Sequence, residues 1–350
     1  MLFRSKSFMK KRLDYIDFVR AIGILGVIAI HTFSYNLTSP INNFIWNYLH
    51  FVVVAFVFCS GYVLTYFYKN SFPNFSTTLL WYKKRILRLL IPFYSYLLIH
   101  FALFFLFPQF FSGLDLKKSW DFFFKSVFLT GGVGIGWLPL LFLQLTLLFP
   151  IFLLLFKKRI LLISYIIFAS LTALFFTIQT FPYSYYKYVM WIPWSLILIF
   201  SMYAAFNEPL KQKLYVKIAV VSGIVFLFLT HVLSFHHKSL SLIDYKYPPS
   251  LYYLSYATFM SSLLILLCRT FLSKYLVSFW NFVSKNSYQL FFIHLIVLDF
   301  TLSLKKYIFI LNYVFLEIIF VIGIALVISF VLEKLKKLNL LILRSIRRFR

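Results

Sequence analysis

Acidic residues are scarce in this sequence: 9 Asp and Glu stand against 35 Lys and Arg, which gives a formal net charge of +26 at pH 7. Charged residues of both signs make up only 13% of the 350 residues, whereas about 25% is usual in a soluble globular chain. This shortage excludes an ordinary soluble domain, and no long polar stretch is present to form a second one. The chain is therefore expected to be one integral-membrane domain.

Cysteine and metal-ligand clusters are also rare. The two cysteines, Cys59 and Cys268, both lie in apolar segments, so the sequence predicts neither a disulfide framework nor a cysteine metal site. His236 and His237 are adjacent but have no third ligand at a suitable spacing. No metal is therefore predicted.

Apolar residues, at 62%, dominate what is present. Runs of roughly 17–25 residues are long enough to cross a bilayer. We expect such runs at about ten places: residues 15–36, 46–68, 88–107, 136–156, 160–178, 189–206, 218–235, 250–268, 287–304 and 313–332. The predicted fold is an all-α bundle of about ten transmembrane helices.

The connections between these runs indicate an orientation. With the N-terminus in the cytoplasm, the inner segments hold 26 Lys and Arg and the outer segments hold 8. Cytoplasmic loops carry the excess of basic residues, so we expect both termini inside a cell (plasma) membrane. Residues 1–14 form a basic N-terminus, residues 15–332 the bundle and residues 333–350 a basic tail. Because the basic residues are spread over short connections, anionic lipid headgroups are the expected partner of the tail, and nucleic acid is not.

Two ionisable residues stand out in the first run, FVRAIGILGVIAIHTF (18–33). Arg20 and His31 are eleven residues apart, so on a helix they project from nearly the same face, about 16 Å apart along the axis. Asp17 is placed to neutralise Arg20 one turn away. Arg20 alone is typical of an interfacial arginine that sets topology. Polar groups within a bilayer usually face a cavity or the bundle interior, which makes His31 a candidate for function.

These residues resemble the R-x10-H motif of the membrane-bound acyltransferase 3 family. Further segments are similar to motifs of that family, in the same order. They are AFVFCSGYVL (55–64) with Ser60 and Gly61, KKRILRLLIPFY (83–94) with Arg85, Arg88 and Pro92, GWLPLLFLQLTLLFPIF (136–152) with Trp137, and NSYQLFFIHLIVL (286–298) with His294. The resemblance covers nearly the whole chain.

The resemblance implies O-acyl transfer, usually of acetyl, from cytoplasmic acyl-CoA to a hydroxyl of a cell-envelope or exported glycan. Acyl-CoA (acetyl-CoA) is then a donor co-substrate and no cofactor is bound permanently. The acceptor is a glycan or a lipid-linked saccharide. Arg85 and Arg88, three residues apart, are expected to hold the phosphates of coenzyme A as bidentate donors, although topology alone also explains basic residues there.

In this reading Arg20 reaches the same anionic group or a carbonyl, and His31 deprotonates the acceptor hydroxyl as general base. A covalent acyl-histidine intermediate is the alternative. Asp17, Ser60, Trp137 and His294 are possible cavity-lining residues. Ser60 fits a close helix contact as well, and His294 a core position.

The sequence departs from the family pattern at two places. Gly136 stands before Trp137 where many members have His, and Leu295 follows His294 where Pro is frequent. A fused extracytoplasmic hydrolase-like domain, which some members carry, is not expected. These departures leave the acceptor open.

Two other functions remain open: a polysaccharide exporter or flippase, and a membrane scaffold without catalysis. The aligned Arg20 and His31 favour the enzyme, since a scaffold has no need of them. A transporter is expected to have broken helices or paired halves, which the sequence does not reveal. The choice of acetyl or succinyl and the oligomeric state also stay open. His50, His100, His231, Asp299 and Glu317 are expected to be structural or interfacial, with Asp299 and Glu317 as possible acceptor contacts.

Overall fold

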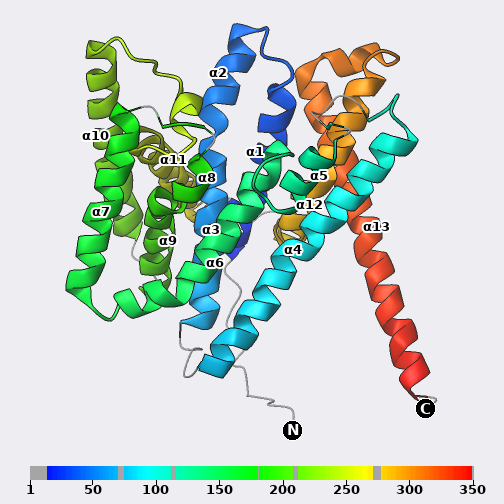
Figure 1. The fold of residues 1–350 in the computed structure, drawn as a ribbon, viewed down its shortest axis with the longest axis horizontal. Helices are drawn as coiled ribbons and strands as arrows, with labels where there is room; N and C mark the ends of the chain where they lie inside the picture. The colour runs from blue at the N-terminus through cyan, green and yellow to red at the C-terminus, as the bar shows by residue number, and fades with distance from the viewer. Residues whose placement is uncertain are drawn as a thin grey trace.

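The chain forms an all-helical bundle in the computed structural model (Figure 1). The structure describes residues 14–69, 75–111, 116–117, 119–179, 181–183, 185–207, 212–270 and 277–348. Its α-helices are α1 (Asp14–Phe33), α2 (Pro40–Leu49), α3 (Phe51–Tyr68), α4 (Phe75–Leu106), α5 (Trp120–Val127), α6 (Trp137–Leu155), α7 (Arg159–Ile178), α8 (Tyr186–Val189), α9 (Trp191–Phe206), α10 (Gln212–Phe235), α11 (Leu251–Thr270), α12 (Val277–Leu304) and α13 (Val314–Arg348). The short 3-10 helices are η1 (Gly134–Gly136), η2 (Leu242–Tyr245) and η4 (Phe309–Asn312).

Ten helical segments of the described residues are long and apolar enough to cross a membrane, which confirms the predicted number. They alternate in direction, so α1 begins and α13 ends toward the same face, at the bottom of Figure 1. We call this the lower face and the opposite one the upper face. Both α2 and the connection from α10 to α11 lie at the upper face.

Several helices extend beyond the predicted membrane spans. Helix α4 begins at Phe75 rather than near residue 88, α12 begins at Val277 rather than near 287, and α13 continues to Arg348 rather than ending near 332. Hydropathy marks only the stretch inside the lipid. Lys and Arg, which are good helix formers, are frequent at the start of α4 and at the end of α13, so these two helices continue past the apolar stretch.

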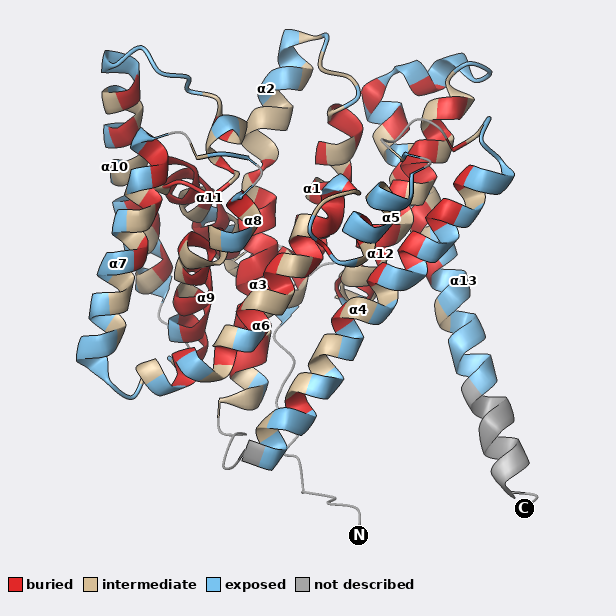
Figure 2. Cartoon of the chain, viewed as in Figure 1, coloured by how far each residue is buried: buried red, intermediate tan, exposed pale blue. Residues whose placement is uncertain are grey.

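Helix α1 lies at the centre and contacts α2, α3, α11, α12 and α13. Figure 2 shows buried residues concentrated in α1, α3 and α9, while α7, α10 and much of α13 present exposed faces. Those exposed faces are apolar, with Leu161, Val221 and Ile319 among their large side chains. An all-round apolar exterior of this kind faces lipid in a membrane protein.

Small residues allow the central helices to approach closely. A Cβ atom on Gly26 of α1 would lie 2.7 Å from a methyl group of Val52 in α3, and one on Gly61 of α3 would collide with Ser201 Oγ of α9. Close contact at small residues is the usual way in which membrane helices associate. This packing fixes the position of α3, whose other side faces the candidate site.

Candidate active site

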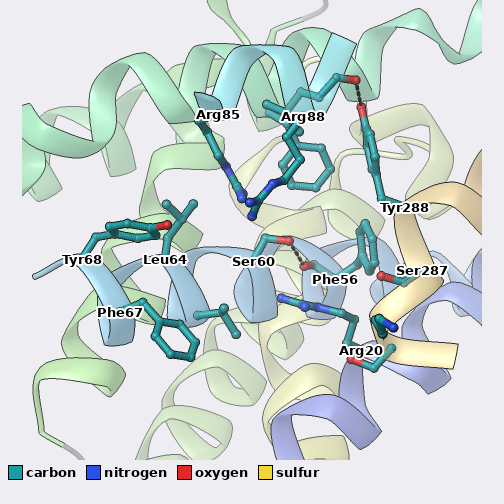
Figure 3. A pocket seen from close by; sticks show the side chains of 15 residues that line it. Arg20, Phe56, Ser60, Leu64, Phe67, Tyr68, Arg85, Arg88, Ser287 and Tyr288 are labelled. Carbon is teal, nitrogen blue, oxygen red and sulfur yellow. Dashed lines mark hydrogen bonds between the residues drawn. The ribbon is translucent and has the colours of Figure 1, made fainter. Parts of the chain in front are cut away.

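A cavity of about 470 Å³ opens in the lower half of the bundle, among α1, α3, α4, α6 and α12. Its charged and polar lining residues are Arg20, Ser60, Tyr68, Arg85, Arg88, Ser284, Lys285, Ser287 and Tyr288. In Figure 3 the side chains of Arg85 and Arg88 reach from α4 toward Ser60, and Arg20 reaches toward it from α1 on the other side. Three arginines from two helices therefore converge on one space.

None of the acidic residues that the structure describes forms an ion pair with a cavity arginine. Within the described part of the chain, no ion pair joins Arg20, Arg85 or Arg88 to a carboxylate, whereas Lys285 pairs with Glu333 at 2.7 Å. Arg20 Nη2 donates to the Cys59 carbonyl at 3.2 Å, and the buried Nε atoms of Arg20 and Arg85 lack a hydrogen-bond partner among the described groups. Uncompensated guanidinium groups in a cavity are suited to binding an anion.

A second cavity of about 320 Å³ adjoins the first at Tyr68, Arg85 and Arg88. Thr77, Trp81 and Lys84 line it further. The two arginines thus contact both cavities, while the neighbouring Lys83 is exposed and lines neither. Arg85 and Arg88 therefore line both cavities, whereas Lys84 lines only the second.

Ser60 and its neighbour Gly61 serve opposite sides of α3. Ser60 lines the large cavity, and its hydroxyl donates to the Phe56 carbonyl at 3.1 Å. Gly61 packs on α9, as described above. Ser60 therefore lines the cavity, and Gly61 makes the close helix contact.

Asp17 does not line the cavity but contacts Ser284, a residue that does. Its Oδ1 accepts a hydrogen bond of 2.5 Å from the hydroxyl of Ser284, which lines the cavity from α12. The carboxylate therefore connects α1 to α12, while the Arg20 guanidinium turns to Cys59 of α3. Asp17 is placed to fix the wall rather than to fill the space.

His31 and His294 meet near the upper face, outside this cavity. Their ring centroids are 5.3 Å apart; His294 is fully buried and His31 is half-buried in the last turn of α1. His294 Nδ1 lies 3.0 Å from the Leu290 carbonyl, which only accepts, so Nδ1 carries the proton. In the neutral ring the Nε2 atom then has a free lone pair, and no described group forms a hydrogen bond with it. This is the form of histidine that accepts a proton.

Lys246, one of the 8 basic residues of the predicted outer segments, enters the bundle beside these histidines. It follows η2, is only 3% exposed, and its Nζ lies 3.0 Å from His50 Nδ1. The same Nζ lies 5.2 Å from the ring centroid of Trp137 and 5.0 Å from that of Tyr247. We call His31, His50, Lys246 and His294 the upper cluster. Burial lowers the pKa of Lys246 to about 7.

The predicted site residues therefore fall into two groups. Arg20, Ser60, Arg85 and Arg88 meet at the large cavity, with Asp17 behind it. His294 belongs to the upper cluster, and the Trp137 ring lies beside Lys246 of that cluster. Neither residue lines the large cavity. Lys246 was missed because its setting, YKYPPSLYY, reads as a loop before a span. The flanking tyrosines and prolines were the available signal that this lysine is covered.

Two further pairs of ionisable residues contact each other in the described part of the bundle. The His100 ring bonds Asp299 at 2.9 Å and the Tyr96 hydroxyl at 2.8 Å, all three buried between α4 and α12. Lys305 and Asn36 both hold the Glu317 carboxylate, at 2.8 and 2.9 Å. These contacts fit the structural roles expected for them. No group of three His, Cys, Asp or Glu able to hold a metal ion is found among the residues that the structure places.

The chain matches a known protein family over most of its length. A family model described as an acyltransferase domain matches residues 13–334, nearly the whole chain. No curated protein and no solved structure matches the chain.

Proposed function

Since the chain belongs to the acyltransferase 3 family of membrane proteins, we propose that it moves an acyl group from cytoplasmic acyl-CoA to a hydroxyl of a cell-envelope or exported glycan. The acyl group proposed is acetyl. The observation that carries the proposal is the convergence of Arg20, Arg85 and Arg88 on one cavity without a described acidic partner. Coenzyme A offers that cavity several phosphate charges.

In this proposal the lower face is cytoplasmic, as the excess of basic residues favours. Arg85 and Arg88 bind the phosphates of the donor at the junction of the two cavities. Arg20, deeper in α1, holds an anionic or carbonyl oxygen further along the donor. The thioester then extends along α1 toward His31, which lies eleven residues, or about 16 Å, above Arg20.

His31 acts as the general base. The acceptor oxygen attacks the carbonyl carbon of the thioester while His31 takes the hydroxyl proton. The C–S bond then breaks, and the leaving thiolate of coenzyme A takes the proton from His31, which restores the neutral base. The lone pair on His294 Nε2, next to His31, supports a second proton acceptor in the same cluster.

The test compares donor binding in two double variants of the full-length protein. Arg85→Ala/Arg88→Ala removes two charge-assisted contacts, each worth about 1.5–3 kcal/mol, so binding of acetyl-CoA is expected to weaken by at least about 100-fold. Lys157→Ala/Lys158→Ala removes the same charge from an exposed turn at the lower face and is expected to bind normally. If the two variants bind acetyl-CoA with equal affinity, Arg85 and Arg88 do not bind the donor and serve only to set the membrane topology.

The acceptor side needs a separate measurement. Mass spectrometry of envelope glycans from cells with and without the gene is expected to reveal acyl esters that depend on the protein. Glycans that fail to reach the surface without the gene would favour an exporter instead, and glycans that reach it with unchanged acylation would contradict the proposed acyl transfer.

A further inference from the structure

The upper cluster gathers four basic groups and no acid. Within the described residues, the ion pairs are made by other side chains, and none includes Lys246. Its described polar contact is the His50 ring, and its other neighbours are the faces of Trp137 and Tyr247. A buried ammonium without a counter-charge is costly, and elsewhere in this bundle Asp299 and Glu317 sit beside their basic partners.

His50 adds an unused donor at the same place. With Lys246 donating to Nδ1, the neutral His50 ring carries its proton on Nε2. His50 is only 2% exposed, and its Nε2 has no hydrogen-bond partner among the described groups. A buried donor left unpaired costs about 1–3 kcal/mol, so a ligand oxygen that accepts from it is favoured.

The cluster also acts on the proposed base. Lys246 and His294 both interact electrostatically with His31, and His31 interacts with His50. His31 is the half-buried member, so the cluster meets accessible space at that ring. A ligand bound between Lys246 and His50 would therefore lie beside the proposed point of proton transfer.

From these contacts we propose that Lys246 and His50 bind a carboxylate or phosphate group of the saccharide acceptor and hold its hydroxyl at His31. The inference rests on the proposed function, which it deepens by giving the acceptor an acidic group. The anionic oxygen takes the remaining protons of Lys246 and the proton on His50 Nε2. It also supplies the counter-charge that the described residues lack. Neutral saccharides would gain nothing from this pair.

The experiment measures binding without acyl-CoA, so it does not depend on acyl transfer. Purified full-length protein in detergent is titrated, at constant ionic strength and pH 6.5, with D-glucuronate, D-glucose 6-phosphate and D-glucose. At least one anionic sugar is expected to bind, and to bind at least about tenfold more weakly to Lys246→Met. Glucose is expected to show no dependence on Lys246. Comparing the two anionic sugars separates a carboxylate from a phosphate.

Two further variants control for charge and for folding. Lys238→Met removes the same charge from an exposed position in the same upper loop and is expected to bind like the wild type. His50→Gln keeps Lys246 and is expected to weaken the anionic sugar as well, which preserves the test if Lys246→Met does not fold. The inference is overturned if neither anionic sugar binds better than glucose, or if Lys246→Met and His50→Gln bind like Lys238→Met. Acyl transfer with intact kinetics in those variants would leave the proposed function standing and remove this inference alone.

Discussion

His31 is the general base of the proposed reaction. It lies in the last turn of α1, and the centroid of its ring is 5.3 Å from that of His294. A general base needs a nitrogen that accepts a proton, which an amide side chain of similar size lacks. The two properties, packing and basicity, are therefore separable at this position.

Replacement of His31 by Gln is expected to reduce acyl transfer by about 100-fold or more, since proton transfer by a positioned side chain contributes about 10²–10⁴-fold. Binding of acetyl-CoA is expected to survive, because His31 lies three turns above Arg20. Arg20→Ala is expected to weaken donor binding first. The assays are single-turnover transfer and equilibrium donor binding, normalised to folded protein. His231→Gln, on an exposed face of α10, is the matched control. Transfer at the wild-type rate by His31→Gln would make this histidine structural.

Lys246 makes a separate prediction about stability. Burial lowers its pKa to about 7, whereas the unfolded value is near 10.5. Between these values the unfolded chain binds a proton that the folded chain does not, so stability rises with pH. The full penalty applies below pH 7.

We expect the wild type to gain up to about 1.4 kcal/mol per pH unit, relative to Lys246→Met, between pH 7 and about 10. Thermal unfolding of both proteins in the same detergent at pH 6, 7, 8, 9 and 10 measures the difference. Titrating groups outside the upper cluster cancel in this comparison. A difference that is flat with pH would mean that Lys246 is charged in the fold at every pH tested.

At the scale of single helices, the packing of α3 on α9 depends on Gly61. The Ser201 hydroxyl that faces this glycine is fully buried and donates to the Leu198 carbonyl at 2.7 Å. A methyl group at Gly61 leaves this hydroxyl no space without a shift of the helices. Because Ser60 is the next residue, such a shift also moves the cavity wall.

Gly61→Ala is therefore expected to destabilise the protein by about 1–3 kcal/mol, the usual cost of overpacking. Gly323→Ala in α13 is the matched control, since nothing lies within 4 Å of a Cβ at that exposed position. It is expected to be neutral or to stabilise by up to about 1 kcal/mol through helix propensity. Apparent melting temperatures of the two variants give the comparison. Equal effects would show that the α3–α9 contact adapts to a side chain at residue 61.

Hydropathy predicted the ten spans because a membrane helix needs a long apolar run, and each run stands alone in the sequence. It did not predict how far α4, α12 and α13 continue as helices beyond their apolar runs. Arg20 and His31 were found because their spacing lies within one helix. Lys246 was missed because its partner, His50, is 196 residues away.

At the scale of the whole molecule, the neighbours of each span could not be predicted from hydropathy. Arg20 and Arg85 meet at one cavity although 65 positions separate them, and His100 pairs with Asp299 across 199 positions. Lateral packing in a membrane depends on small residues and buried polar pairs, which single-span patterns do not contain. The resemblance to a family predicted the candidate site residues. In the fold these residues lie in two places, the lower cavity and the upper cluster.

This division gives the bundle a direction. The three arginines lie toward the lower face, where α1 begins, and the upper cluster lies toward the opposite face. A donor from the cytoplasm and an acceptor outside can meet in this arrangement only if the lower face is cytoplasmic. The excess of 26 to 8 basic residues favours that orientation.

Labelling of single introduced cysteines in intact cells tests the orientation. Both native cysteines, Cys59 and Cys268, are buried, so the background signal is expected to be low. Leu240→Cys, at an exposed position between α10 and η2, is expected to react with a membrane-impermeant maleimide in whole cells. Lys158→Cys, in the exposed turn between α6 and α7, is expected to react only after permeabilisation. Three of the ten described spans separate Lys158 from Leu240, so the two positions lie on opposite sides of the membrane, and a reversed result at both reverses the whole bundle. The arginine cavity would then face away from acyl-CoA, and the proposed path from cytoplasmic donor to external acceptor would be wrong.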